Sequence, residues 1–133
     1  MNSMLIVDDN QGVRVSLAKY LKSRNYHTDE AASGREAIKK AAERSYDAIL
    51  LDLIMPDVSG MELLVELKKI RPSSRVIMMT GFATINNSVE AMKRGAYDYL
   101  EKPFDLAELD SVIQRCIQEA RFDPKGKIPL QNS

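Results

Sequence analysis

Short apolar runs alternate with longer amphipathic segments along the whole chain. Five runs rich in aliphatic or aromatic residues are predicted to be strands, at 4–9, 26–31, 47–52, 75–80 and 96–102. Five segments between and after them carry apolar residues near helical spacing and are predicted to be helices, at 12–25, 33–45, 60–70, 85–95 and 106–120. Aliphatic strands that alternate with helices are typical of a parallel sheet covered on both faces. The pattern therefore predicts a doubly wound α/β fold.

Local signals mark some of the helix ends and inward faces. Ser33 is placed to cap the second helix, with Glu36 three residues later, and Gly95 is placed to end the fourth. We expect the last helix to face the core with Leu106, Leu109, Val112, Ile113, Cys116 and Ile117. Five methionines are expected to fill the core, namely Met55, Met61, Met78, Met79 and Met92.

Polar side chains stand at the ends of four predicted strands. Asp8 and Asp9 end the first strand, Asp52 the third, Thr80 the fourth and Lys102 the fifth. Asp52 directly follows a run of aliphatic residues, and burying a lone carboxylate is costly unless something compensates for its charge. Because ligands of such sheets bind beyond the carboxyl ends of the strands, we expect these five residues to converge on one edge.

This set of side chains suits phosphoryl chemistry. Three carboxylates close together raise one another's pKa or require a cation, and Mg²⁺ binds to one or two carboxylates while keeping waters or phosphate oxygens as its other ligands. The Lys102 ammonium and the Thr80 hydroxyl are suited to phosphoryl oxygens, and a carboxylate is a competent nucleophile. The residues therefore predict that Asp52 accepts a phosphoryl group.

Each of these residues also has a purely structural interpretation. A strand-terminal aspartate such as Asp52 is commonly a helix cap, most threonines and lysines are solvated or structural, and a strand tyrosine such as Tyr99 is commonly part of a core. His27, the only histidine, is expected to be a surface or strand residue without a catalytic part. The functional interpretation rests on the conjunction of four sites, in order, at strand ends.

Four sequence segments resemble the receiver domains of two-component response regulators. They are "IVDDN" (6–10), "LLDLIMPDVSG" (50–60), "MMTG" (78–81) and "GAYDYLEKPF" (95–104), and the resemblance extends over about residues 4–120. It implies a flavodoxin-like sheet with strand order 2-1-3-4-5 and five helices. It also implies that the chain is a phosphorylation-dependent switch whose phosphoryl donor is a sensor histidine kinase.

The same resemblance assigns roles to individual residues. It implies that Asp52 is the phosphoacceptor, and that Mg²⁺ is bound by Asp8, Asp9, Asp52 and the backbone carbonyl of Ile54. Thr80 and Lys102 would bind the phosphoryl oxygens, and Tyr99 would be the switch aromatic whose orientation follows Thr80. The Lys102–Pro103 peptide bond is expected to be cis.

The segment "TGFATINNSVEAMKRGAYDYLEKPF" (80–104) is similar in particular to receivers of nitrogen-regulator-type activators. In those proteins the receiver precedes an ATPase that works with an alternative sigma factor, followed by a DNA-binding module. The 133 residues contain no G-x-x-x-x-G-K-[ST] motif, which leaves open a receiver cut from a longer chain or a single-domain regulator. We expect a receiver at 1–121, a linker or disordered tail at 122–133, and dimerisation through the fourth helix, fifth strand and fifth helix.

Three other functions fit these motifs less well. A haloacid-dehalogenase-type phosphatase needs a second aspartate two residues after its nucleophile, where this chain has Ile54. A receiver fold that signals without phosphorylation usually lacks one of the acids or the lysine, and none is missing here. A flavodoxin-like redox protein would carry a Ser/Thr-rich phosphate loop after the first strand, which the sequence lacks.

The amino-acid composition narrows the possible partners and location but indicates no particular chemistry. Lysine plus arginine and aspartate plus glutamate balance at 19 each, which gives no reason to expect direct nucleic-acid or membrane binding. The single cysteine, Cys116, excludes an internal disulfide and fits a reducing compartment, so a cytoplasmic location is expected. The chain is expected to be a regulatory phosphoacceptor that catalyses only its own phosphorylation and slow dephosphorylation.

Overall fold

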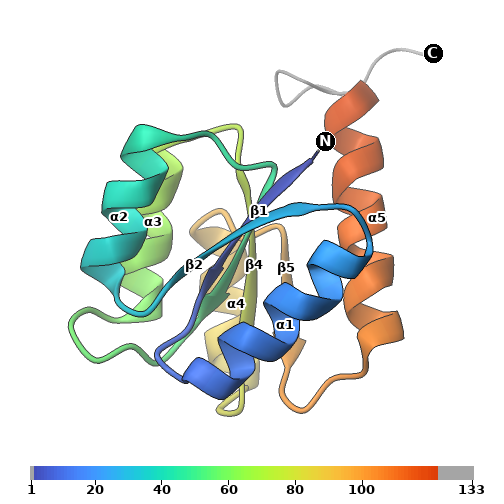
Figure 1. Ribbon diagram of the computed structural model, residues 1–133. Helices are drawn as coiled ribbons and strands as arrows, with labels where there is room; N and C mark the ends of the chain where they lie inside the picture. The colour runs from blue at the N-terminus through green and yellow to red at the C-terminus, as the bar shows by residue number, and fades with distance from the viewer. Residues whose placement is uncertain (1, 123–133) are drawn as a thin grey trace.

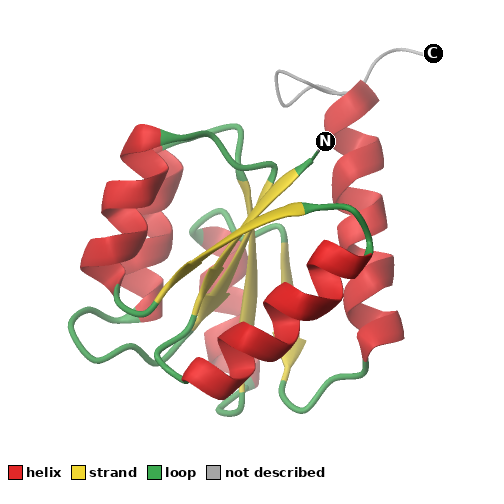
Figure 2. Cartoon of the chain, in the orientation of Figure 1, coloured by secondary structure: helices red, strands yellow, loops and turns green. Residues whose placement is uncertain are grey.

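The computed structural model describes residues 2–122, in which strands and helices alternate (Figure 1). The five strands are β1 Ser3–Val7, β2 His27–Ala31, β3 Ala48–Asp52, β4 Arg75–Thr80 and β5 Asp98–Glu101. The five helices are α1 Gln11–Ser23, α2 Gly34–Glu43, α3 Gly60–Ile70, α4 Ile85–Lys93 and α5 Leu106–Phe122. Figure 2 shows the strands as one twisted sheet with helices on both sides. The predicted doubly wound α/β fold is confirmed.

The sheet has the order β2-β1-β3-β4-β5, and all its strand pairs are parallel. The register places Val7 beside Leu51 and Asp52 beside Met79. The carboxyl ends of β1, β3 and β4 therefore reach the same edge of the sheet. The expected strand order is confirmed, and it places Asp52, at the end of β3, and Thr80, at the end of β4, toward the same edge of the sheet.

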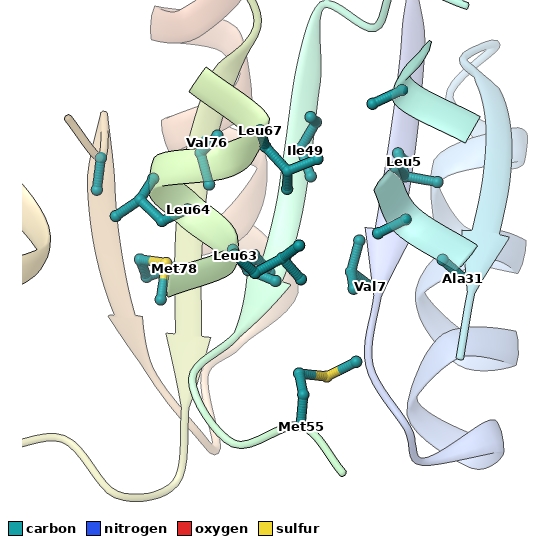
Figure 3. Packing of buried hydrophobic residues seen from close by; sticks show 14 of the residues in the cluster. Leu5, Val7, Ala31, Ile49, Met55, Leu63, Leu64, Leu67, Val76 and Met78 are labelled. Atoms are coloured by element: carbon teal, nitrogen blue, oxygen red, sulfur yellow. The ribbon is translucent and has the colours of Figure 1, made fainter. Parts of the chain in front are cut away.

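Alternate side chains of the strands pack against different helices. One cluster joins α2, α3 and Ala91 of α4 to the face of the sheet that carries Leu5, Ile49 and Met78. Figure 3 shows Leu63, Leu64 and Leu67 of α3 packed over that face. The other cluster joins α1 and α5 to the opposite face. Two buried faces explain why the central strands are continuously apolar.

The helix ends follow the predicted chemistry. The Ser33 hydroxyl accepts a hydrogen bond from the Glu36 N–H at 3.1 Å, and the Glu36 carboxylate accepts one from the Ala32 N–H at 2.7 Å. The first contact makes Ser33 the N-cap of α2, and the second resembles a capping box but takes the N–H of Ala32, the residue before the cap. Gly95 follows the end of α4 with φ of 106°, a conformation that only glycine adopts without strain.

Two expected core residues are exposed. Met92 of α4 is 48% exposed and Leu106 of α5 is 46% exposed. Among the residues of α4 only Ala91 is buried, so the next position along the helix faces solvent. Leu106 lies in the first turn of α5, and the buried stretch of that helix begins at Leu109. The other methionines and the other residues of α5 that were predicted to face the core are buried or partly buried.

Several element ends also differ from the sequence prediction. β1 ends at Val7, so Asp8 and Asp9 lie in the loop that follows it rather than in the strand. The turn begins there because the Asp8 carboxylate accepts a hydrogen bond from the Asn10 N–H at 2.9 Å.

Apart from Phe122, with which α5 ends, the predicted tail at 122–133 lies outside the described residues. Within residues 2–122, no helix combines the length and apolar character needed to cross a membrane.

Candidate functional site

The three predicted acids meet at the carboxyl edge of the sheet. Carboxylate oxygens of Asp8, Asp9 and Asp52 all lie within 4.8 Å of one another. Asp8 and Asp52 are buried and Asp9 is exposed. Lys102 reaches the same place from the segment after β5, with its Nζ 2.6 Å from Asp8 Oδ2 and 3.2 Å from Asp52 Oδ2. The structure thus brings together four of the residues predicted from the strand ends.

Asp52 is fixed by the tight loop that follows β3. Its Oδ1 accepts a hydrogen bond from the Ile54 N–H at 3.3 Å. Gly60 donates its N–H to the Leu53 carbonyl at 2.7 Å. A Cβ at Gly60 would lie 2.4 Å from the Asp52 carbonyl oxygen, so only glycine allows this close approach. The "DLIMPDVSG" sequence therefore fixes the position of the Asp52 carboxylate in the acidic cluster.

Burial and neighbouring charges set the protonation of the site. Burial raises the pKa of Asp52, and the Asp8 carboxylate raises it further, while Lys102 and the Ile54 N–H act in the opposite direction without reversing the shift. Burial alone would lower the pKa of Lys102, but its contacts with Asp8 and Asp52 raise that pKa above its ordinary value. Lys102 therefore stays an ammonium ion at neutral pH.

This donor set fits a hard divalent cation. Three carboxylates face a single ammonium group, so negative charge exceeds positive charge when all are ionised. Mg²⁺ prefers oxygen ligands and binds through one or two carboxylates with waters in its remaining positions. Asp8, Asp9 and Asp52 are the residues here that can hold such an ion.

Thr80 and Tyr99 belong to β4 and β5, the two strands that follow β3 across the sheet. Thr80 ends β4, is fully buried, and accepts a hydrogen bond on its hydroxyl from the Phe82 N–H at 3.1 Å. The Lys102 N–H donates to the Thr80 carbonyl at 2.7 Å. Tyr99 packs against the core, and within the described residues its buried hydroxyl has no hydrogen-bond partner. Among the described residues, no hydrogen bond therefore fixes the Tyr99 hydroxyl in this orientation.

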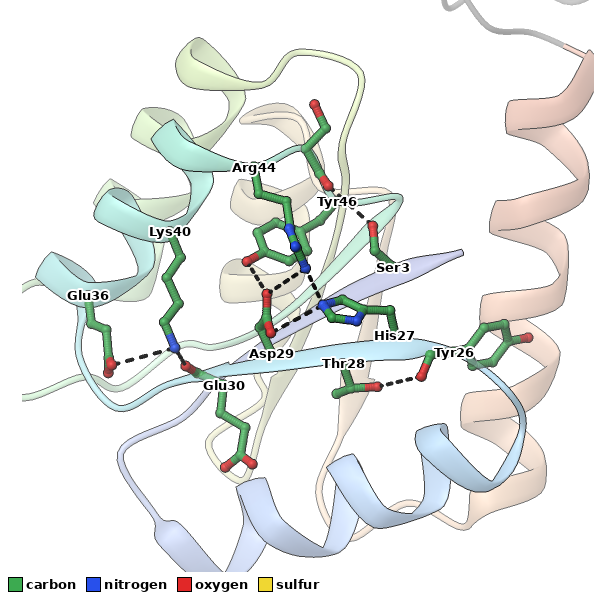
Figure 4. A network of polar contacts seen from close by, with 11 residues as sticks. Ser3, Tyr26, His27, Thr28, Asp29, Glu30, Glu36, Lys40, Arg44 and Tyr46 are labelled. Atoms are coloured by element: carbon green, nitrogen blue, oxygen red, sulfur yellow. Dashed lines mark hydrogen bonds and ion pairs between the residues drawn. The ribbon is translucent and has the colours of Figure 1, made fainter. Parts of the chain in front are cut away.

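The remaining sequence expectations near the site have clear outcomes. The Lys102–Pro103 peptide bond is cis, as expected. His27 begins β2 and contacts Asp29 and Arg44 in a polar network on that edge strand, apart from the acidic cluster (Figure 4). His27 therefore has a structural place in the fold.

Sequence reasoning missed two charged residues that support the site. Arg14 of α1 donates to the Asp8 carbonyl at 2.7 Å. Asp57, in the loop after β3, accepts hydrogen bonds from the N–H groups of Gly34 and Arg35 at 2.9 and 3.0 Å. These two bonds lower the pKa of Asp57 and tie the loop to the start of α2. No local signal predicts either contact, because the partners come together only in the folded sheet.

The chain belongs to the response regulator receiver domain family, which it matches over residues 4–114. It is 36% identical over 115 residues to the DNA-binding transcriptional regulator NtrC of Azospirillum brasilense, a match that covers 86% of this chain and 24% of NtrC. The chain spans about a quarter of the length of the first curated relatives that it matches. The expected family and its nitrogen-regulator type are confirmed.

Solved receiver structures share the fold. The beryllofluoride-activated NtrC4 receiver domain dimer superposes with a TM-score of 0.85 at 38% identity, covering 90% of this chain and 98% of that one. A response regulator from Burkholderia pseudomallei, solved with a phosphorylated aspartic acid, calcium ion and citrate, superposes with a TM-score of 0.82 at 30% identity. That match covers 98% of this chain and 76% of the other. The chain is thus a receiver domain, a regulatory phosphoacceptor.

Proposed function

We propose that Asp52 accepts a phosphoryl group from a sensor histidine kinase and that this modification switches the domain between two conformations. The observation that carries the proposal is the position of the Lys102 ammonium, which contacts the carboxylates of both Asp8 and Asp52 inside the acidic cluster. A phosphorylated aspartic acid and a calcium ion in the Burkholderia pseudomallei regulator support the same chemistry.

The transfer requires little from the protein beyond placement and charge. A carboxylate oxygen of Asp52 attacks phosphorus, the new O–P bond forms as the P–N bond to the donor histidine breaks, and the electron pair leaves with the donor nitrogen. Lys102 then contacts a phosphoryl oxygen in place of the Asp52 carboxylate. Asp8, Asp9, Asp52 and the Ile54 carbonyl would hold Mg²⁺, which would supply charge that stabilises the phosphoryl oxygens.

The switch begins at Thr80. Its hydroxyl accepts a hydrogen bond from the Phe82 N–H, which leaves its own proton available to a phosphoryl oxygen on Asp52. When Thr80 moves toward that oxygen, the Tyr99 ring follows into the space beside it. No hydrogen bond to the described residues has to break when the Tyr99 ring turns. The two orientations of Tyr99 then bias the β4–β5 edge between two states.

The output that we propose is transcription. The NtrC relative is a DNA-binding transcriptional regulator, and an ATPase and DNA-binding module on a longer chain would carry the response. The activated NtrC4 receiver is a dimer, which supports dimerisation of this chain through α4, β5 and α5. On α4, Ile85 and Val89 are 82% and 47% exposed one helical turn apart, so this face has apolar surface to bury.

We further propose that the domain acts in the cytoplasm, that the receiver ends where α5 ends and is followed by a linker or tail, and that the domain is not a turnover enzyme. Ile54 stands where a haloacid-dehalogenase-type phosphatase needs its second aspartate, so the group that would protonate a leaving alcohol is missing. Neither this domain nor its acidic site is proposed to contact nucleic acid or membrane.

Intact-mass spectrometry after incubation with acetyl phosphate tests the phosphoacceptor function. The wild-type domain should gain one phosphoryl group when Mg²⁺ is present and none when EDTA replaces it. Asp52→Asn should gain none, whereas Asp47→Asn, a change at an aspartate outside the site, should be labelled like the wild type. Equal labelling of Asp52→Asn and the wild type would contradict the proposal.

A further inference from the structure

An arginine of α1 reaches back to the acidic loop that precedes the helix. Arg14 Nη1 donates a hydrogen bond to the backbone carbonyl of Asp8 at 2.7 Å. The Arg14 side chain is 14% exposed although it carries a full charge. A charged donor that is mostly removed from solvent forms a stronger hydrogen bond than a neutral one. The carbonyl of Asp8 is therefore held firmly.

A second contact fixes the guanidinium group itself. Arg14 Nε lies 3.3 Å from Glu30 Oε1, and Glu30 belongs to β2, which pairs with β1 beside the site. Figure 4 shows the Glu30 side chain on the α1 side of β2, while its backbone carbonyl accepts a hydrogen bond from Lys40 on the other side. The planar guanidinium thus bridges two fixed acceptors, which a lysine ammonium on a flexible stem does not match.

The contact with Arg14 controls one particular peptide unit. The Asp8 carbonyl belongs to the peptide that joins Asp8 to Asp9, so holding it sets the direction in which the chain enters Asp9. The other polar atoms of Asp8 are held separately, by Ala31, Asn10 and Lys102. Asp9 is exposed, and within residues 2–122 its side chain forms no hydrogen bond or ion pair of its own. Only the backbone places its carboxylate.

We propose that Arg14 is a positioning residue for the cation site. It holds the 8–9 peptide so that the Asp9 carboxylate faces those of Asp8 and Asp52. This inference rests on the proposed Mg²⁺ site at these acids. Arg14 contacts neither the ion nor the phosphoryl group, so its loss weakens Mg²⁺ binding and leaves the transfer step unchanged once the ion is bound.

If Arg14 served only as a counter-charge, its removal would change the Mg²⁺ affinity in the opposite direction. Removing a positive charge near three carboxylates strengthens the attraction for a divalent cation. Arg14→Met removes the charge and both hydrogen bonds and keeps much of the apolar stem. Arg14→Lys keeps the positive charge but loses the planar guanidinium that contacts both acceptors. Positioning predicts weaker Mg²⁺ binding in both variants, whereas counter-charge alone predicts tighter binding in the first and wild-type binding in the second.

The experiment is Mg²⁺ titration by calorimetry of the wild type, Arg14→Met, Arg14→Lys and the control Arg24→Met, with urea unfolding to confirm that each is folded. Arg24 also forms an ion pair, with Asp110, but lies at the other end of α1. We expect about a tenfold higher dissociation constant in Arg14→Met, a smaller rise in Arg14→Lys, and no change in the control, since partners one step removed from a metal typically contribute 10–100-fold in affinity.

Phosphorylation by acetyl phosphate supplies a second readout. The Mg²⁺ concentration that gives half the maximal rate should rise in the Arg14 variants, while the rate at saturating Mg²⁺ equals that of the wild type. Wild-type or tighter Mg²⁺ binding in Arg14→Met overturns the inference; if that variant is unfolded, wild-type binding in Arg14→Lys does so. Asp9→Ala distinguishes a failure of the Arg14 inference from a failure of the proposed cation site. Unchanged Mg²⁺ binding in Asp9→Ala contradicts the cation site itself.

Discussion

The Lys102 ammonium nitrogen lies 2.6 Å from the Asp8 carboxylate, although the two residues are 94 positions apart in the chain. Asp8 follows β1 and Lys102 follows β5, the first and last strands along the chain. This ion pair therefore joins two distant segments at the edge of the sheet where Asp52 lies. The Asp8 side chain is 1% exposed and that of Lys102 is 23% exposed. Buried charges require such partners, and the pair therefore ties the stability of the free domain to its signalling site.

Lys102→Met should destabilise the domain when no cation is present. The change leaves the buried carboxylates of Asp8 and Asp52 without their ammonium partner, and hydrogen bonds to charged groups contribute about 1.5–3 kcal/mol. Urea unfolding in EDTA should show a loss of about that size, with Lys93→Met, at an exposed position of α4, close to the wild type. Added Mg²⁺ should recover part of the loss because it binds only the folded state. A variant as stable as the wild type in EDTA would show that the ion pair contributes nothing.

Thr80→Ala should be phosphorylated but should transmit the change poorly. Asp52, Lys102 and the cation site remain, so phosphoryl transfer does not depend on the Thr80 hydroxyl. The measurement is the set of amide chemical shifts over residues 81–104 with and without beryllofluoride as a phosphoryl mimic. Thr80→Ser, which retains the hydroxyl, should keep most of the wild-type response. A response of full size in Thr80→Ala would remove Thr80 from the switch.

The phosphorylated domain should be long-lived, with a half-life of minutes or more. Hydrolysis requires a water in line with the breaking bond, and Ile54 and Phe82 have no polar group that could orient it. Their side chains are 52% and 67% exposed, so polar replacements at both positions have room to reach water. Ile54→Asn combined with Phe82→Glu should shorten the half-life by roughly tenfold if positioning of the water is worth about 1.4 kcal/mol of barrier.

Phosphate release from the purified, phosphorylated domain, with Mg²⁺ and without kinase, measures this lifetime. Tyr20→Phe, a change on α1 away from the site, serves as the control. A wild-type half-life of seconds, or a double variant no faster than the wild type, would show that these two positions do not set the rate.

Cys116 should make folding stability fall at alkaline pH. Burial raises the pKa of this thiol from 9.0 to about 12, so the folded protein keeps its proton where the unfolded chain loses it. The contribution is fully present below pH 9 and is lost as pH rises toward 12. Between pH 8 and pH 10 the free energy of unfolding should fall by about 1.4 kcal/mol more in the wild type than in Cys116→Ala. Parallel pH profiles for the two proteins would contradict this assignment.

Much of the fold was predictable because the strands are buried on both faces. The run from Ala48 to Asp52 is apolar at every position except the last, a pattern that marks both a central strand and the carboxylate at its end. The site followed from the same rule, since parallel strands bring their carboxyl ends to one edge. The sequence alone therefore predicts that Asp8, Asp52 and Lys102 lie together.

Other features depend on contacts that no local pattern records. Helical spacing suggested that Met92 and Leu106 are buried, but it does not show how narrow a strip of α4 touches the sheet or where α5 first meets it. Arg14 and Asp57 act on backbone groups, so their side-chain types carry no signal of their partners. Such contacts become visible only when the loops around the sheet edge are in place.

Whether Asp52 itself carries the phosphoryl group is tested by chemical mapping of the modified residue. An acyl phosphate is reduced by borohydride to an alcohol, which converts a phosphorylated aspartate to homoserine and leaves free carboxylates unchanged. After treatment with acetyl phosphate and Mg²⁺, digestion and mass spectrometry should find homoserine at position 52, with Asp8 and Asp9 unmodified. Homoserine at another aspartate, with position 52 intact, would show that Asp52 is not the phosphoacceptor.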